Sequence, residues 1–271
     1  MRLIAHQSVA KVIGSQQNED VFFPMRKSQK PFSRFVMCDG ATTSFAGHAW
    51  AKALAKALYS APKSVEVFAN ELFRDDEHFQ NSIRDEFFSN CFKQAIAEYE
   101  KQYDVSKLSF FKQEAFKRGS AATLLFLVQD DKTPDTIYLT AIGDTCCFIM
   151  DSANNVIRSF PLTSVEEFST SAYLVDTKKE GLKALFNPTT REFFWKRATV
   201  DISSGDGVKI VCATDAISQW IIANSCNANA ISELLLSVEK PRRQYFESFI
   251  QSLRHNGAIA VDDSTIAVLG K

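Results

Sequence analysis

Five aspartates in this chain of 271 residues share one local context, because each lies where an apolar, strand-like run begins or ends. They are Asp20, Asp39, Asp144, Asp215 and Asp262. A single aspartate in such a place is typical of a turn, but five indicate strand ends that converge on one edge of a sheet. Clustered carboxylates repel one another unless cations lie between them. Such oxygen ligands favour Mg²⁺ or Mn²⁺, and a pair of these ions can hydrolyse a phosphate ester.

The elements that must position these carboxylates can be predicted from the pattern of apolar residues. The predicted strands are 3–13, 34–38, 122–128, 137–142, 146–150, 208–213 and 264–269, and the predicted helices are 46–60, 65–104 in two pieces, 217–223, 230–238 and 241–254. Tight turns join the three strands between 122 and 150, which predicts an antiparallel meander. Residues 161–200 are less regular, and we expect a lid or flap-like insertion there, within a single domain that spans 1–271.

An ordered set of short motifs accompanies these elements from about residue 8 to the end of the chain. The motifs are Asn18-Glu19-Asp20, Asp39-Gly40, Gly119-Ser120-Ala121-Ala122, Gly143-Asp144-Thr145, Thr214-Asp215 and Asp262-Asp263-Ser264-Thr265. In this order and spacing, the sequence resembles the metal-dependent protein phosphatases of the 2C type, as a divergent member of bacterial type. The resemblance implies an α+β fold, a sandwich of two antiparallel β-sheets flanked by pairs of α-helices. It also implies hydrolysis of phosphoserine and phosphothreonine in proteins.

The resemblance further implies a site with two Mn²⁺ or Mg²⁺ ions. Asp39 would bridge both ions, and the carbonyl of Gly40 would bind one of them. Asp215 and Asp262 would hold the other ion. A hydroxide shared by the two ions would attack phosphorus in line, so no cysteine is needed as a nucleophile.

The other acidic positions have accessory roles in the same resemblance. Glu19 and Asp20 would hold metal-bound waters or ligate an ion from the side. Asp144 matches one carboxylate of a third metal site, but Gln219 stands where the family often has the second carboxylate. We therefore expect a third ion to bind weakly or not at all.

Two departures from the family pattern concern the substrate phosphate. Ser15 stands where the family usually has an arginine that holds the phosphate, and Ala41 stands where a histidine or methionine is common. Arg26, Lys27 or Arg34 could take the place of that arginine, although surface charges of this kind are more often merely solvated. Basic residues of the flap-like segment are equally open to either interpretation; they are Lys178, Lys179, Lys183, Arg191, Lys196 and Arg197.

Three functions remain open at this point. The intact carboxylates favour an active serine/threonine phosphoprotein phosphatase, whereas Ser15 and Ala41 favour a pseudophosphatase that binds a phosphoprotein or a kinase without turnover. The third is a phosphohydrolase that acts on a small metabolite. No glycine-rich phosphate-binding loop is present, which argues against nucleotide hydrolysis.

Composition limits the cellular locations and the classes of binding partner that can be expected. The formal net charge of −1 gives no global field that would attract nucleic acid or an anionic membrane. The N-terminal residues lack the apolar core of a signal peptide, and the six cysteines form no CxxC pair. We expect reduced, buried thiols in a cytoplasmic monomer that acts on a phosphorylated protein, with a cognate kinase as a possible partner. The four histidines are too scattered to predict a zinc site.

Overall fold

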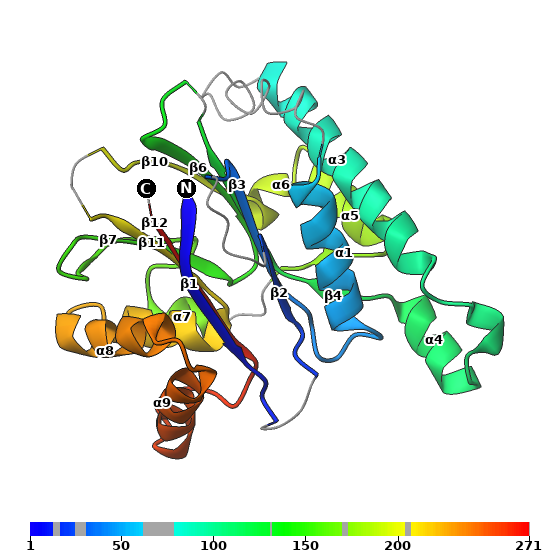
Figure 1. Cartoon of the computed structure of the whole chain (residues 1–271). Coiled ribbons are helices and arrows are strands. Elements are labelled where there is room, and N and C mark those ends of the chain that lie inside the picture. The colour runs from blue at the N-terminus through cyan, green and yellow to red at the C-terminus, as the bar shows by residue number, and fades with distance from the viewer. Residues whose placement is uncertain are drawn as a thin grey trace.

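Two five-stranded antiparallel sheets lie face to face in the computed structural model, which describes residues 1–12, 17–24, 31–61, 79–130, 132–169, 173–203 and 207–270 (Figure 1). The first sheet has the order β1 (Arg2–Val9), β12 (Ser264–Gly270), β11 (Lys209–Ala213), β7 (Cys146–Met150) and β8 (Val156–Phe160). The second has the order β10 (Lys196–Asp201), β6 (Thr136–Ile142), β5 (Leu124–Gln129), β3 (Arg34–Asp39) and β2 (Asp20–Phe23). A small sheet pairs β4 (Ala121–Ala122) with β9 (Val175–Asp176).

The strands are apolar on both faces because each sheet is covered on both sides. In β3, Phe35 and Met37 pack between the two sheets, and Val36 and Cys38 pack against helices. This alternation follows from the two-residue repeat of side-chain direction in a strand. Full burial of a large apolar side chain stabilises the fold by about 1.5–3 kcal/mol, so the unbroken apolar runs in the sequence identify the central strands.

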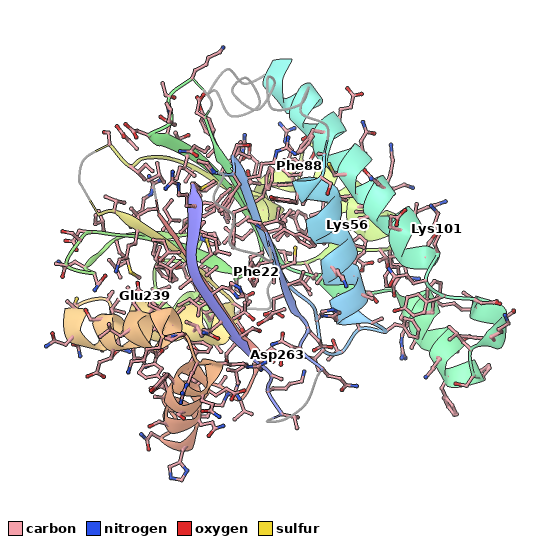
Figure 2. The ribbon with its side chains drawn as sticks, viewed as in Figure 1. Phe22, Lys56, Phe88, Lys101, Glu239 and Asp263 are labelled. Atoms are coloured by element: carbon pink, nitrogen blue, oxygen red, sulfur yellow. The ribbon has the colours of Figure 1, made fainter. Side chains whose placement is uncertain are left out.

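Helices cover the outer faces of the sandwich. α1 (Gly47–Tyr59) and α3 (Phe79–Glu100) lie on the second sheet, and α7 (Asp215–Ala223), α8 (Ala228–Glu239) and α9 (Arg243–His255) lie on the first (Figure 1). Trp50, Leu54 and Leu58 of α1 are completely buried, as their spacing of four residues predicts. Figure 2 shows Phe88 in this helix-covered layer and Phe22 at the sheets.

The predicted fold class is confirmed, but the predicted meander is wrong. β5 and β6 pair in the second sheet, whereas β7 pairs with β8 and β11 in the first sheet. The chain crosses from one sheet to the other through Gly143, which has a φ of 98° that favours glycine. Apolar alternation identified the three strands correctly, but it contains no information about which sheet a strand joins.

The segment 161–200 is only partly irregular. It contains a short 3₁₀ helix (Val165–Ser169), β9, α5 (Lys179–Phe186) and α6 (Arg191–Phe194). Leu185 and Trp195 are buried in the layer beneath α3. Residues 196–200 belong to β10, which pairs with β6 at the edge of the second sheet. The C-terminal part of this segment is thus packed into the main fold.

Other sequence predictions can be compared with the described residues. Five of the six cysteines are buried, and only Cys226 is exposed. The predicted helix over 65–104 corresponds to α3 over its second half, and its first part, up to residue 78, lies outside the described residues. A second short helix, α4 (Phe110–Arg118), leads from α3 toward β4. None of the described helices is long and apolar enough to span a membrane.

Candidate functional site

The ends of β2 and β3 bring two of the predicted aspartates together. Asp20 begins β2 and Asp39 ends β3, and the antiparallel register pairs these residues directly. Asp20 is buried, and Thr214 donates a hydrogen bond of 3.0 Å to its Oδ2. Among the described residues, Oδ1 of Asp20 has no hydrogen-bond partner. A buried oxygen without a partner is destabilising, so this atom suits a ligand that the protein does not itself provide.

Asp215 and Asp262 come from neighbouring strands of the other sheet. The register of β11 and β12 places the end of β11 beside the start of β12. Asp215 is the first residue of α7, where the helix dipole favours a negative charge. The amide of Thr265 donates a hydrogen bond of 3.1 Å to Oγ1 of Thr214, which joins the two loops. Because Thr214 also holds Asp20, it connects the strand ends of both sheets.

The pKa of each aspartate of the β2–β3 pair reflects this crowding. Burial raises the pKa of Asp20 to about 8, and the charges of Asp263 and Asp215 raise it as well. Burial raises the pKa of Asp39 well above its usual range, and repulsion from Asp20, Asp215 and Asp144 adds to that effect. These interactions require the carboxylates of the two sheets to lie near one another.

The remaining aspartates belong to the same group. Burial raises the pKa of Asp215 to about 7, with repulsion from Asp144 and Asp262. Burial also raises the pKa of Asp144, and the charge of Asp262 contributes. The structure therefore brings together all five strand-end aspartates, here called the acidic cluster: Asp20, Asp39, Asp144, Asp215 and Asp262. Such a group either retains protons near neutral pH or binds cations.

Two acidic residues beside the cluster have partners within the protein. Oε2 of Glu19 accepts hydrogen bonds from the ammonium of Lys11 at 2.9 Å and from the hydroxyl of Thr42 at 2.6 Å. Asp263 accepts the backbone N–H of Lys11 at 2.7 Å and that of Glu19 at 2.6 Å. Asp263 therefore fastens the loop after β1 and the loop before β2 to the start of β12 (Figure 2).

A close backbone contact fixes the residue after Asp39. The amide of Gly40 donates a hydrogen bond of 3.1 Å to the carbonyl of Glu19. A Cβ at position 40 would lie 2.4 Å from the carbonyl carbon of Gly47 and 3.0 Å from the carbonyl oxygen of Glu19. Only glycine allows the end of β3 to approach the start of α1 this closely. The position of Asp39 is therefore set by backbone packing.

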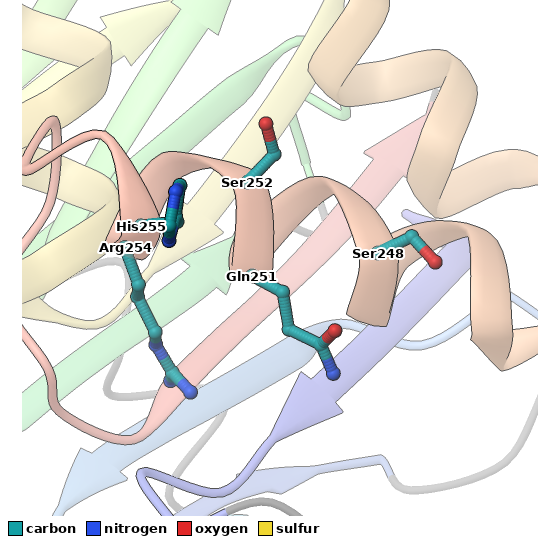
Figure 3. Close-up of a pocket in the computed structure, with 5 residues that line it drawn as sticks. All are labelled: Ser248, Gln251, Ser252, Arg254 and His255. Carbon is teal, nitrogen blue, oxygen red and sulfur yellow. The ribbon is translucent and has the colours of Figure 1, made fainter.

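Arg254, in the last turn of α9, fixes the loop that carries Asp262. Its guanidinium donates hydrogen bonds to the carbonyl of Asp262, to Oγ of Ser264 at 3.1 Å and to the carbonyl of Ala10 at 3.0 Å. No pattern in the sequence indicated this role. The same side chain lines a pocket of about 550 Å³ on α9, together with Ser248, Gln251, Ser252 and His255 (Figure 3). None of these lining residues is acidic, so this pocket is not part of the acidic cluster.

The residues of the acidic cluster are of types that bind divalent cations, but their side chains are not already arranged as a metal site. Carboxylate oxygens and a backbone carbonyl such as that of Gly40 are ligands that Mg²⁺ and Mn²⁺ accept. Within the described ranges, no three histidine, cysteine, aspartate or glutamate side chains form a group that could hold an ion as they stand. The donor set thus fits, and its members must draw closer together to coordinate an ion.

Comparison with known proteins agrees with this architecture. A family model described as protein phosphatase 2C matches residues 11–263. The chain belongs to the protein phosphatase 2C family. The solved catalytic domain of the serine threonine protein phosphatase PstP, in complex with two manganese ions, superposes with a TM-score of 0.53 at 13% identity, covering 97% of this chain and 95% of that chain.

A second solved structure has the same fold. It is a variant of a bacterial serine phosphatase that superposes with a TM-score of 0.51 at 13% identity, covering 97% of this chain and 96% of that chain. A comparison with curated protein sequences finds no match. This member of the 2C family is therefore highly divergent in sequence.

The structure also places the basic residues considered as substitutes for the phosphate-binding arginine of the 2C family. Ser15, Arg26 and Lys27 lie outside the described residues. Arg34 is buried and donates hydrogen bonds to backbone carbonyls at the C-terminal end of α1, including that of Ala61 at 2.9 Å. Arg191 forms an ion pair of 3.2 Å with Asp85 of α3. Arg34 and Arg191 thus have structural partners.

The other departures from the 2C pattern lie near the cluster. Gln219 follows Asp215 by one turn of α7, on the same face of the helix. Ala41 donates its amide to the carbonyl of Ala121 at 2.9 Å. His48 is exposed on α1. Lys196 and Arg197 lie in β10, at the edge of the second sheet.

Proposed function

We propose that this protein is a Mn²⁺- or Mg²⁺-dependent serine/threonine phosphoprotein phosphatase that hydrolyses phosphate monoesters. The observation that carries the proposal is the acidic cluster, in which buried, mutually repelling carboxylates from both sheets meet at one end of the sandwich. Family membership supports the reaction class. The presence of two manganese ions in the superposed PstP structure supports the choice of metal.

The ligand set in this proposal uses residues from both sheets. Asp39 and the carbonyl of Gly40 would hold one ion, with Asp39 shared between two, and Asp215 and Asp262 would hold the other. Asp20 would contribute its unpaired Oδ1. When bound, two such ions would lower the pKa of water and neutralise charge on a phosphate ester. We propose Asp144 as a ligand for a weakly bound third ion.

Hydrogen bonds within the chain hold the proposed ligands in place. The amide of Asp39 donates a hydrogen bond of 2.9 Å to Oγ1 of Thr123, and this oxygen lies 2.6 Å from Oγ1 of Thr145, next to Asp144. Asp263 and Glu19 join the surrounding loops. These contacts fix the backbone that carries the carboxylates, which reduces the cost of assembling the site.

The setting and partners follow from the same proposal. The substrate would be a phosphorylated protein, and a cognate kinase would catalyse the opposing reaction. Six free cysteines, five of them buried, suit a reducing, cytoplasmic environment. We expect the protein to act as a monomer, without nucleic-acid or membrane partners.

One observation favours a second candidate, a pseudophosphatase that binds a phosphoprotein or a kinase. The described acidic residues do not form a ready-made metal-binding group. A chain that does not draw them together would bind its partner without turnover. The difference between the two candidates is therefore whether the acidic cluster supports metal-dependent turnover.

Hydrolysis of p-nitrophenyl phosphate and of a phosphothreonine peptide, measured over a Mn²⁺ titration, tests the proposal. We expect metal-dependent turnover that is lost in Asp39→Asn while the circular dichroism spectrum is retained. Asp104→Asn is the matched control, because Asp104 is an exposed helix-capping residue that asparagine can replace. A wild-type protein that binds Mn²⁺ by calorimetry without turnover would replace the proposal with the pseudophosphatase.

A further inference from the structure

The acidic cluster presents an electrostatic difficulty for a phosphorylated substrate, because a phosphate group carries up to two negative charges. A nearby cation would reduce this repulsion. Arg34 and Arg191 are already engaged by the carbonyls of α1 and by Asp85. Arg254 directs its guanidinium at the carbonyls of Ala10 and Asp262.

Lys11 is the cation that the described structure places at the edge of the cluster, on a partly buried side chain. Burial acts to lower the pKa of Lys11, but the hydrogen bond and ion pair with Glu19 and the attraction to Asp263 and Asp262 together raise it. The side chain of Lys11 is 27% exposed and that of Glu19 is 22% exposed. The ammonium of Lys11 is therefore partly exposed to solvent.

Three contacts define where the ammonium of Lys11 lies. It donates hydrogen bonds to Oε2 of Glu19 at 2.9 Å and to Oγ1 of Thr42 at 2.6 Å, and the Thr42 hydroxyl in turn donates to the same Oε2 at 2.6 Å. An ammonium group has three N–H donors, so these bonds leave one for a ligand. The backbone amide of Lys11 is held independently by Asp263. Glu19 and Thr42 thus orient the side chain, and Asp263 fixes the backbone that carries it.

We propose that Lys11 binds a phosphate oxygen of the substrate, with Glu19 and Thr42 as positioning residues. The inference deepens the proposed function and rests on it for the nature of the ligand. Glu19 lies one residue before the start of β2, which carries Asp20, and Thr42 lies three residues after the end of β3, which carries Asp39. A phosphate near those aspartates is therefore within reach of the loop that holds Lys11. Lysine provides a point charge without the two-pronged geometry of arginine, so Lys11 would contribute affinity more than orientation.

Binding and turnover of a phosphothreonine peptide in the presence of saturating Mn²⁺ test this inference. Lys11→Met removes the charge and keeps much of the apolar stem, and Lys11→Arg restores a charge. Lys101→Met is the matched control, because Lys101 is exposed just past the C-terminal end of α3 (Figure 2). The unphosphorylated peptide of the same sequence measures binding that does not involve phosphate.

We expect Lys11→Met to raise Kd and KM for the phosphopeptide roughly ten- to a hundredfold, as for a lost charge-assisted hydrogen bond. The Mn²⁺ affinity should change little, Lys11→Arg should recover part of the loss, and Lys101→Met should match the wild type. Unchanged peptide affinity in Lys11→Met would refute the inference. A change confined to Mn²⁺ affinity would also refute it, because Lys11 would then act only by screening the carboxylates.

The same experiment separates this inference from the proposed function. If the wild-type protein binds the phosphopeptide without hydrolysing it, and Lys11→Met loses that binding, the phosphatase proposal fails and the role of Lys11 stands. If turnover is metal-dependent and Lys11→Met behaves as wild type, the function stands and the role of Lys11 fails. A wild-type protein that neither binds nor hydrolyses the phosphopeptide overturns both.

Discussion

Replacing Asp20 by asparagine should stabilise the metal-free protein, and increasingly so as the pH rises. The Asp20 carboxyl is buried beside Asp39, and one of its oxygens has no partner among the described residues. Asparagine has nearly the same shape, so its oxygen can still accept the hydrogen bond from Thr214. Its NH₂ group can donate to the Asp39 carboxyl, which already interacts with Asp20. The substitution therefore removes a carboxyl group that is costly to ionise, without opening a cavity.

The size of the effect follows from the pKa of Asp20. In the folded protein the pKa is raised from 3.8 to about 8, so between these values the unfolded chain has released a proton that the folded protein still holds. Folding stability must then fall as the pH rises. One pKa unit corresponds to about 1.36 kcal/mol, which amounts to about 4 kcal/mol between pH 5 and pH 8. At about 2–4 °C per kcal/mol for a chain of this size, Tm would differ on the order of 10 °C.

Thermal unfolding of the EDTA-treated proteins at a series of pH values checks this result. We expect the Tm of Asp20→Asn to exceed that of the wild type by a margin that grows from pH 5 to pH 8. Asp104→Asn is the control, because Asp104 is exposed and the pKa of its carboxyl is lowered by hydrogen bonds from Ser106. If the Tm values of wild type and Asp20→Asn remain parallel across this range, Asp20 is already ionised and the cluster is not coupled as described.

Three further substitutions test the surroundings of the acidic cluster. Arg254→Ala should raise the Mn²⁺ concentration for half-maximal hydrolysis of p-nitrophenyl phosphate roughly ten- to a hundredfold, with partial recovery in Arg254→Lys; an unchanged titration would remove Arg254 from the positioning of Asp262. Gly40→Ala should lower Tm, because its Cβ would lie 2.4 Å from a backbone carbon of Gly47; a wild-type melting curve would contradict that contact. Gln219→Asp should bind one more Mn²⁺ ion by calorimetry, opposite Asp144, and an unaltered stoichiometry would count against the assumed geometry.

Much of the fold was predictable because its strands are fully buried and its helices are amphipathic. The apolar runs at 34–38, 146–150 and 208–213 each correspond to a central strand. The course of the chain between sheets was not predictable, because the short turn at Gly143 can continue a hairpin or cross to the facing sheet. The register of neighbouring strands depends on contacts between distant segments, which no local pattern records.

In the candidate site, too, features that depend on neighbouring residues could be predicted, and contacts between distant segments could not. The position of each aspartate at a strand end is a local feature, so the acidic cluster could be predicted as a group. The contribution of Arg254 could not be predicted, because it contacts Ala10 across more than two hundred residues of chain. Asp262 and Asp263 are adjacent and chemically equal in the sequence. The charges of both residues act on Asp215, and only the fold shows that Asp263 is also held by two backbone amides.

The acidic cluster draws Asp20 and Asp39 from one sheet and Asp215 and Asp262 from the other. The two sheets meet through apolar side chains, and apolar contacts are non-directional. An ion coordinated by both pairs would act as a crosslink between the layers, and it would be released when either layer unfolds. Hydrogen–deuterium exchange should then slow together in β3 and β12, although these strands share no hydrogen bonds. Metal affinity and the cooperativity of unfolding would be two measurements of the same linkage.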